Sequence, residues 1–226
     1  MEVIRRPRVI QDSSKASLFK GKTIGLVPTM GALHRGHMSL VGACREENDV
    51  AVVSIFVNPA QFAPSEDLLR YPRDLDGDMT KLEEAGVDTL FMPEEASIYP
   101  DGFQTAIEVK GLSEKLCGAF RQGHFAGVAT VVAKLLNMVT PTRAYFGAKD
   151  YQQGLIIRRL AVDLNLPVEI AVLPTVREED GLAMSSRNQY LDAAKRAAAG
   201  ALFRCLSLAE GKIKSEIGRA SCRERV

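Results

Sequence analysis

Short runs rich in β-branched residues alternate along the chain with segments of helical periodicity, and this alternation constrains the fold more than any other sequence feature. The expected strands are TIGLVP at 23–28, VAVVSIFV at 50–57, DTLFMP at 88–93, RAYFG at 143–147 and PVEIAVLP at 167–174. Between them lie helical patterns near 37–47, 74–86, 126–139 and 150–164. Because parallel strands need such crossover helices, we predict an α/β fold, a Rossmann-like doubly wound parallel sheet with helices on both faces.

The string PTMGALHRGH follows the first of these strands and leads into a helix. Ligands of doubly wound sheets bind beyond the carboxyl ends of the strands, so this turn is a candidate phosphate site. Gly31 and Gly36 allow close backbone approach, and His34 and His37 can reach phosphate oxygens beside the N-terminus of the helix. The alternative is a plain glycine-rich turn with two surface histidines.

The string FVNPAQF ends the second strand. Its Asn58 and Gln61 can present uncharged amide donors and acceptors to a hydroxy acid, while Phe62 supplies an apolar wall. An ordinary Asn-Pro turn closing the strand is the alternative, and this motif alone favours that reading.

Three aspartates, Asp74, Asp76 and Asp78, lie near the start of the next expected helix. Carboxylates are favoured at that end by the helix dipole without any metal. Mg²⁺ remains open for one of them, because it takes one or two carboxylates beside substrate phosphates, and Asp78 would suffice.

Two further polar stretches precede helices. In FRQGHFAGVATVV, Arg121 can hold a carboxylate and His124 can line a pocket, although a helix-entry loop uses the same residues. In YFGAKDYQQG, Lys149 is placed to neutralise phosphate charge, Asp150 to contact a ribose hydroxyl or cap the helix, and Gln153 to face the substrate. A solvated Lys-Asp pair is the alternative for the second stretch.

The stretch REEDGLAMSSRNQYL follows the last expected strand. Its two adjacent hydroxyls and Arg187 can form an anion clamp that closes over a triphosphate. A Ser-Arg-Asn helix cap is the alternative, and in isolation the cap is favoured.

The end of the chain changes character from about Asn188, where the sequence becomes Ala-rich and helical. The final IGRASCRERV has no apolar periodicity and matches a translated sequencing adapter. We therefore expect a nucleotide-binding domain over 1–186, the start of a truncated, mainly helical C-terminal domain over 187–214, and a non-native tail over 215–226.

Composition excludes several classes of function. Lys and Arg total 29 against 28 Asp and Glu, so a net charge of +1 gives no general attraction to nucleic acid or anionic membranes. The 4 cysteines form no C-x-x-C pair, which argues against a zinc site or a disulfide framework. The N-terminus is not that of a signal peptide and no apolar run reaches membrane-spanning length, so we expect a cytoplasmic protein.

Taken in order, these motifs resemble the pantothenate synthetase (pantoate-beta-alanine ligase) family over residues 1 to about 192, within the H-x-G-H nucleotidyltransferase superfamily. The resemblance implies a two-step reaction. Pantoate attacks ATP to give pantoyl-adenylate and pyrophosphate, and beta-alanine then displaces AMP to give pantothenate. It also implies Mg²⁺ and a homodimer.

The resemblance carries site roles onto matching positions of this sequence. Catalytic roles fall on His34, His37, Lys149, Ser185 and Arg187. ATP contacts fall on Met30, Gly31, Gly36, His37, Gly147, Lys149, Asp150, Val176, Met184, Ser185, Ser186 and Arg187. Pantoate contacts fall on Asn58, Gln61, His124 and Gln153, and the magnesium-side acidic residue is Asp78.

The sequence also departs from the family. Ala148 stands where many relatives carry an acidic residue, and the C-terminal domain, a lid in the family, is short here. Because a missing lid exposes the adenylate to water, we expect poor turnover from this chain, and a normal rate would refute that.

Three alternatives remain open. A nucleotidyltransferase of the same superfamily would need a second phosphate pocket, whereas Asn58, Gln61 and Gln153 suggest an uncharged one. A tRNA-charging enzyme would need a basic surface for RNA. A nucleotide-binding module without activity would bind ATP and catalyse nothing.

Overall fold

A parallel sheet forms the centre of the protein. The computed structural model describes residues 1–217; residues 218–226, which make up most of the expected tail and include Cys222, lie outside the described residues. The strands are β1 (Glu2–Ile4), β2 (Ile24–Thr29), β3 (Val50–Ile55), β4 (Thr89–Phe91), β5 (Arg143–Gly147) and β6 (Glu169–Leu173). They form a 6-stranded sheet in the order β1-β4-β3-β2-β5-β6, and every pairing is parallel.

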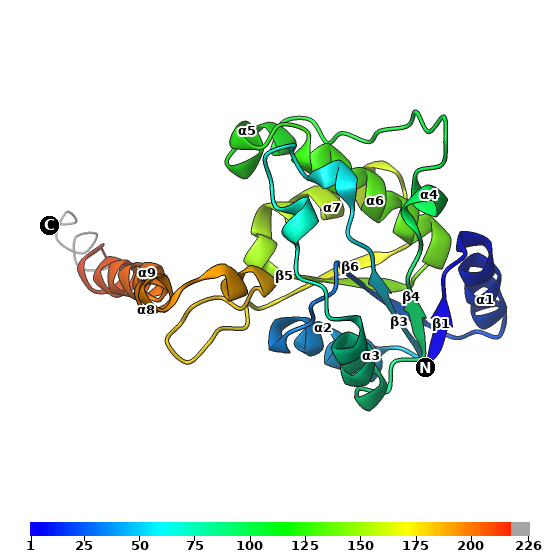
Figure 1. The fold of residues 1–226 in the computed structure, drawn as a ribbon, viewed down its shortest axis with the longest axis horizontal. Helices are drawn as coiled ribbons and strands as arrows, with labels where there is room; N and C mark the ends of the chain where they lie inside the picture. The colour runs from blue at the N-terminus through cyan, green and yellow to red at the C-terminus, as the bar shows by residue number, and fades with distance from the viewer. Residues whose placement is uncertain (218–226) are drawn as a thin grey trace, which may run out of the picture. The chain divides into compact units, whose positions relative to one another are not determined.

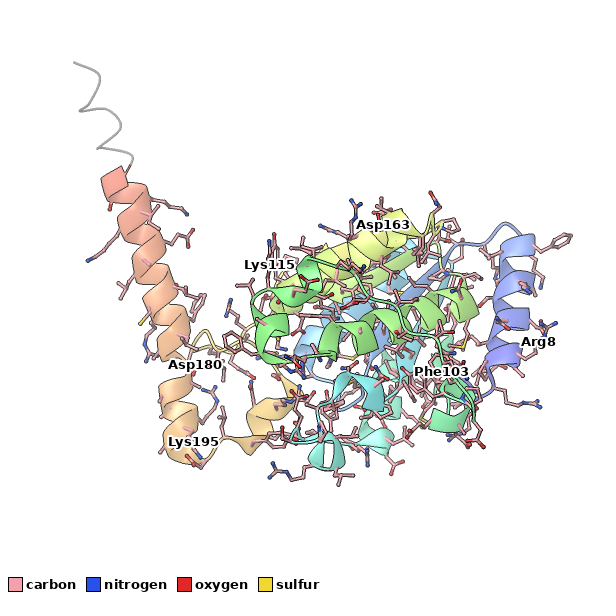
Figure 2. The ribbon with its side chains drawn as sticks, turned by 90° about the horizontal axis from the view of Figure 1, so that it is seen from above. Arg8, Phe103, Lys115, Asp163, Asp180 and Lys195 are labelled. Atoms are coloured by element: carbon pink, nitrogen blue, oxygen red, sulfur yellow. The ribbon has the colours of Figure 1, made fainter. Side chains whose placement is uncertain are left out.

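Helices cover both faces of this sheet, as Figure 1 shows. The longer ones of the first part of the chain are α1 (Pro7–Phe19), α2 (Arg35–Glu47), α3 (Leu75–Glu84), α6 (His124–Val139) and α7 (Tyr151–Asp163), with short helices α4 (Glu95–Ile98) and α5 (Cys117–Phe120). Helices α6 and α7 lie on one side and α2 and α3 on the other (Figure 1). Figure 2, turned by 90°, shows α1, marked by Arg8, at one end of this part of the protein. The predicted α/β fold is confirmed.

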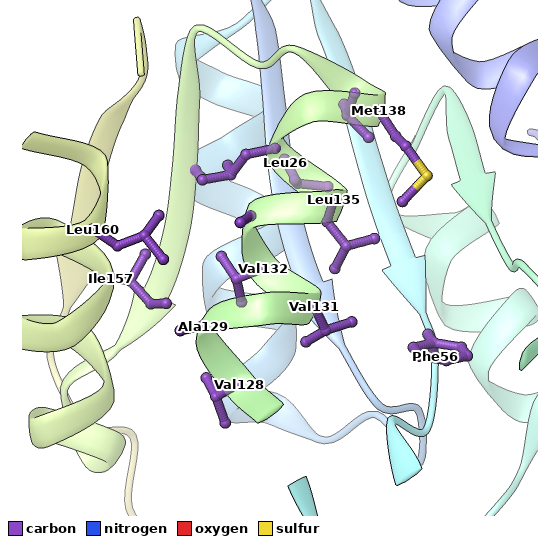
Figure 3. Packing of buried hydrophobic residues seen from close by; sticks show 14 of the residues in the cluster. Leu26, Phe56, Val128, Ala129, Val131, Val132, Leu135, Met138, Ile157 and Leu160 are labelled. Carbon is purple, nitrogen blue, oxygen red and sulfur yellow. The ribbon is translucent and has the colours of Figure 1, made fainter. Parts of the chain in front are cut away.

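Two separate apolar clusters hold these layers together. One joins the sheet to α1, α6 and α7, and the other joins it to α2 and α3. In the first, Val128, Val132 and Leu135 of α6 are buried among the strands (Figure 3). Burying each such side chain contributes about 1.5–3 kcal/mol. Because most of α6 is buried, the helix holds its first residue, His124, in a fixed position.

The side on which successive strands are added to the sheet changes between β2 and β5. From β2 the chain proceeds to β3 and β4 on one side and then returns to place β5 on the other side of β2. This is a topological switch point, where the turns after the two central strands separate and leave a crevice for a ligand. The strings PTMGALHRGH and YFGAKDYQQG both follow strands that border it.

The sequence patterns did not indicate β1 or α1. The short strand β1 pairs with β4 at the edge of the sheet, and Ile10 of α1 is buried in the first cluster. A strand of three residues carries too little periodicity to be recognised without its partner.

The chain divides into two compact units, Met1–Thr175 and a second that begins at Val176. Within the second unit, Arg177 and Ala183 form a β-bridge, and helices α8 (Ala193–Ala199) and α9 (Ala201–Lys212) follow. The expected helical character of the C-terminal region is confirmed. Over residues 1–217, none of the helices combines the length and hydropathy needed to cross a lipid bilayer.

Candidate active site

The turn after β2 has an unusual backbone. Gly31 has φ of 84° and Ala32 has φ of 50°, so two consecutive residues occupy the left-handed region. Glycine tolerates this conformation, whereas alanine adopts it at some cost in free energy and only where surrounding contacts hold it. We refer to residues 30–34 as the β2 loop.

Asp78 of α3 supplies those contacts. Its Oδ2 accepts the backbone N–H of Ala32 at 2.7 Å and its Oδ1 that of Leu33 at 2.6 Å. Lys81, one helical turn further along α3, donates from Nζ to the carbonyl oxygen of Leu33 at 2.9 Å. Asp78 is 1% exposed, and burial raises the pKa of its carboxyl group, although the two N–H groups lower it. A charged pair on one face of α3 therefore fixes the β2 loop.

The two histidines of this motif cap helix α2. His34 is the N-cap residue, and its Nδ1 accepts the backbone N–H of Gly36 at 3.1 Å. Nδ1 of His37 accepts the N–H of His34 at 3.4 Å, and the two rings stack with centroids 4.0 Å apart. A neutral imidazole that accepts at Nδ1 carries its proton on Nε2. Both rings therefore carry an Nε2–H donor beside the N-terminus of the helix.

His37 is held in its neutral form. Burial lowers its pKa from 6.5 to about 3, helped by the neighbouring His34 ring and by the positive charges of Lys149 and Lys81. Lys149 follows β5, on the other side of the switch point from His37. Lys149 itself is ion-paired with Asp150 at 3.3 Å, and both side chains are partly exposed.

The turn after β3, residues 56–62, is the β3 loop, and neutral groups hold it. Asn58 is 1% exposed and lies before the short helix η1 (Pro59–Gln61). Its Nδ2 donates to Oε1 of Gln61 at 3.1 Å and to the carbonyl oxygen of Gly127 at 3.2 Å. Gly127 permits this approach, since a Cβ there would lie 2.2 Å from the carbonyl oxygen of Ala60.

His124, the first residue of α6, holds the same loop from its other side. Its Nδ1 lies 2.8 Å from the carbonyl oxygen of Gln61, and its Nε2 lies 2.9 Å from Nη1 of Arg121. Because a guanidinium only donates and a carbonyl only accepts, the proton is on Nδ1. Burial lowers the pKa of His124, which agrees with a neutral ring. Arg121 does bind a carboxylate, but that of Glu66, through two bonds of 2.6 and 2.7 Å.

A pocket of about 200 Å³ opens beneath the β2 loop. It is lined at the ends of β2, β3 and β4 and at the start of α3 by residues that include Met30, Gly31, Phe56, Arg73, Asp78 and Met92. The pocket thus lies at the carboxyl edge of the sheet, on the β3 and β4 side of β2.

Other predicted residues of the first unit lie along the same edge. Met30 directly follows β2, Gly36 is in the first turn of α2, and Gly147 ends β5. Gln153 is half-buried in the first turn of α7. Its neighbour Gln152 instead ties the segment before α5 to α7, with Nε2 donating to the carbonyl oxygens of Leu112 and Lys115.

The remaining predicted residues belong to the second unit. Met184 donates its backbone N–H to the carbonyl oxygen of Val176 at 3.0 Å. Ser185 is the N-cap of a short 3-10 helix, Ser186–Tyr190, where its Oγ accepts the N–H of Arg187 at 3.3 Å. The Ser185 side chain therefore forms the helix cap that was the alternative interpretation of this stretch. The anion clamp stays a prediction.

The structure also adds residues that the motifs did not single out. Lys81, Tyr99 and Glu66 each contact a predicted site residue: Lys81 holds the β2 loop, Tyr99 donates to Asn58 at 2.7 Å, and Glu66 binds Arg121. For Lys81 a signal existed, because it lies three residues after Asp78 and so on the same helix face. Tyr99 and Glu66 meet their partners through tertiary packing alone.

The metal prediction for Asp78 stays untested, and the geometry gives this residue another task. Both of its oxygens accept backbone N–H groups, and its neighbour Asp74 caps α3 by accepting the N–H of Gly77. Over the described part of the chain, no group of three or more His, Cys, Asp or Glu residues is placed to hold a metal ion.

Fold and site together define a class: a parallel α/β protein whose switch point carries a histidine-containing loop on one side and Lys149 on the other, an arrangement suited to nucleotide phosphates. A family model described as Pantoate-beta-alanine ligase matches residues 2–225. The chain belongs to the pantoate-beta-alanine ligase family.

Individual relatives agree with this assignment. Pantothenate synthetase of Thermodesulfovibrio yellowstonii is 59% identical over 210 residues, which are 93% of this chain and 75% of that protein. The enzyme of Moorella thermoacetica is 54% identical over 215 residues, covering 95% and 76%. Among solved structures, pantothenate synthetase of Thermus thermophilus is 51% identical with a TM-score of 0.90, covering 96% of this chain and 76% of that one. The ligase of Francisella tularensis, complexed with beta-gamma ATP and beta-alanine, is 43% identical with a TM-score of 0.87, covering 92% and 79%.

Proposed function

We propose that this chain catalyses the ATP-dependent condensation of pantoate with beta-alanine to give pantothenate, AMP and pyrophosphate through pantoyl-adenylate. The observation that carries the proposal is the pairing of two differently built loops, which follow the adjacent strands β2 and β3 at the carboxyl edge of the sheet. The β2 loop offers Nε2–H donors of His34 and His37 beside a helix N-terminus, which suits phosphate. The β3 loop offers neutral amides, which suit a hydroxy acid.

In the first step, a carboxylate oxygen of pantoate attacks the α-phosphorus of ATP, and the bond from that phosphorus to the bridging oxygen breaks to release pyrophosphate. No side-chain nucleophile is needed, so catalysis consists of alignment and of offsetting charge. His34 and His37 donate Nε2–H to phosphate oxygens, and the ammonium of Lys149 neutralises the charge that builds up. Because His37 is neutral, it donates without a proton-transfer step.

In the second step, the amine of beta-alanine attacks the acyl carbon of the adenylate. The acyl carbon–oxygen bond breaks, AMP leaves, and the amine gives up a proton as the amide forms. Gln61 and Gln153 hold the pantoyl group, with Asn58 and His124 positioning Gln61. We also propose that Ser185, Ser186 and Arg187 bind the phosphates, and that Val176 and Met184 contact the nucleotide.

Magnesium enters this proposal as part of the nucleotide substrate. Mg²⁺ keeps several waters and binds readily to phosphate oxygens, so it needs few protein ligands. Asp78 stays the predicted magnesium-side residue; each of its oxygens already accepts one backbone N–H of the β2 loop. The homodimer, the cytoplasmic location and a domain boundary after residue 186 remain parts of the proposal.

The test is pantoate-dependent exchange of labelled pyrophosphate into ATP, measured without beta-alanine. We expect exchange in the unmodified chain and a loss of at least about a hundredfold in Lys149→Ala, because a charge-neutralising group of this kind contributes roughly 3 kcal/mol. Lys15→Ala, an exposed lysine on α1, is the matched control and retains full exchange. Exchange that does not need pantoate, or that survives in Lys149→Ala, contradicts the proposal.

A further inference from the structure

Hydrogen bonds fix which way the oxygen and the nitrogen of the Gln61 side-chain amide point. These bonds run from the hydroxyl of Tyr99 to Asn58 and from Asn58 to Gln61. We propose that Tyr99, acting through Asn58, is a positioning residue that turns the N–H groups of the Gln61 amide toward an oxygen of the bound acid. This inference rests on the proposed function, because it takes the acid site to be at Gln61.

The orientation of the Asn58 amide follows from backbone groups. Its Oδ1 accepts the N–H of Ala60 at 3.3 Å, and its Nδ2 donates to the carbonyl oxygen of Gly127 at 3.2 Å. A backbone N–H can only donate and a carbonyl can only accept, so exchanging the oxygen and nitrogen would break both bonds. The hydroxyl of Tyr99 adds a third bond to Oδ1, at 2.7 Å.

The orientation of Gln61 follows in turn. Nδ2 of Asn58 lies 3.1 Å from the Gln61 side chain and can only donate, so the atom that it meets is Oε1. The Nε2 of Gln61 then points the other way, where it lies 3.2 Å from the thioether sulfur of Met30. Sulfur is a weak acceptor, so a carboxylate or hydroxyl oxygen offered by a ligand makes a better partner.

Tyr99 is itself held in place. Its ring makes an edge contact with Phe103, labelled in Figure 2, with centroids 5.2 Å apart, and a tilted contact with Phe56 at 6.4 Å. Burial raises the pKa of Tyr99 to about 12, so the hydroxyl keeps its proton and remains a donor. The backbone of Gln61 is fixed separately, because Nδ1–H of His124 donates to its carbonyl oxygen. Tyr99 therefore adds a third bond that holds the Asn58 amide, and through it the Gln61 amide, in the orientation that the backbone groups set.

The chain contains a matched control. Tyr145 is buried, its hydroxyl accepts from Nδ2 of Asn48 at 2.7 Å and donates to Glu47 at 2.8 Å, and burial raises its pKa to about 12 as well. Both tyrosines thus bond an asparagine side chain, but the Asn48 pair has no link to Gln61. Comparing Tyr99→Phe with Tyr145→Phe separates loss of a buried hydroxyl from loss of amide orientation.

The experiment measures the dissociation constants of pantoate and of ATP by calorimetry, using the full chain and both variants, with thermal unfolding as the check on folding. We expect Tyr99→Phe to weaken pantoate binding about threefold to tenfold, the equivalent of one hydrogen bond, with ATP binding unchanged. Tyr145→Phe leaves both constants within about twofold while lowering thermal stability. Gln61→Glu, which replaces the N–H donors by oxygen acceptors at constant shape, weakens pantoate binding further.

The inference is overturned if Tyr99→Phe binds pantoate as tightly as the unmodified chain, or if ATP and pantoate binding weaken together. Should Tyr99→Phe fail to fold, Gln61→Glu decides alone, and unchanged pantoate binding in that variant overturns the inference. If the unmodified chain binds no pantoate at all, the proposed function fails, and the inference fails with it. If the unmodified chain binds pantoate and Tyr99→Phe binds it equally well, only the inference fails.

Discussion

The loops after β2 and β3 follow adjacent strands and end at the same edge of the sheet, yet they are held by opposite kinds of interaction. The β2 loop is fixed by a buried carboxylate and an ammonium, Asp78 and Lys81. The β3 loop is fixed by a neutral asparagine and a neutral histidine, Asn58 and His124.

The difference matches what each loop is proposed to bind. A loop that binds a highly charged polyphosphate needs a backbone that keeps its conformation beside that charge. Charge-assisted hydrogen bonds suit this task because they are stronger than hydrogen bonds between neutral groups. A loop that recognises the hydroxyl groups of a ligand needs donors and acceptors at defined positions. Side-chain amides provide them, whereas a charged side chain would attract any group of opposite charge. The following predictions test the comparison, from the largest expected effect to the smallest.

Removing the carboxylate should damage the β2 loop most. Asp78→Ala leaves two buried N–H groups without an acceptor, at a cost of about 1–3 kcal/mol for each such group, so we expect a loss of about 3 kcal/mol in the free energy of unfolding. Pyrophosphate exchange should fall with it, because the loop carries His34. Urea denaturation provides the measurement. The exposed Asp76→Ala on the same helix is the control, with a cost below about 1 kcal/mol.

The β3 loop should be broken by a single methyl group. Gly127→Ala places a Cβ 2.2 Å from the carbonyl oxygen of Ala60, which is backbone and cannot move aside cheaply. We expect a loss of about 2 kcal/mol in unfolding free energy and weaker pantoate binding. Gly42→Ala in α2, where nothing lies within 4 Å, should instead be neutral or stabilising. Equal effects of the two substitutions would contradict the close packing of α6 on this loop.

The ion pair behind the β3 loop should contribute less, since it is partly exposed. Glu66→Gln removes the carboxylate that binds Arg121 and should cost about 1 kcal/mol. It should also lower the pKa of His124, because the charge of Glu66 raises that pKa at present. NMR titration of the histidines follows the shift. Asp163→Asn, which opens the exposed pair with Arg159, should cost less than about 0.5 kcal/mol and leave His124 unchanged.

The smallest expected effect is that of the Lys81 charge on the pKa of His37. Because the pKa of His37 is about 3 in the folded state, the neutral ring's contribution to stability is present above pH 6.5. That contribution is lost as the pH falls from 6.5 toward 3. Lys81→Met removes one of the charges that depress this pKa, so the His37 pKa should rise by a few tenths of a unit, on the order of 0.5 kcal/mol. The NMR titration measures it directly, with the exposed Lys22→Met as control. A pKa that is unchanged or lower in Lys81→Met would show that the charge of Lys81 does not depress the His37 pKa.

Much of this site was readable from residue order. The strands and helices that carry it were predicted within a few residues of their observed bounds, because buried parallel strands and amphipathic crossover helices have distinct apolar periods. The histidines, Lys149, Asn58 and Gln61 were singled out as polar residues directly after such strands. Roles for those residues stay predictions, since periodicity locates a site and does not define its ligand.

The sequence by itself determined the α/β class, the family and the placement of the candidate residues after strands, because these depend on local periods and on motif identity. Only the tertiary structure decided that Asp78 holds the β2 loop, that Glu66 binds Arg121 and that Tyr99 reaches Asn58. The physical reason is the distance along the sequence between the partners of each contact. Each of these contacts joins residues 41 to 55 positions apart, and no local pattern specifies which buried donor will meet which acceptor once the layers pack.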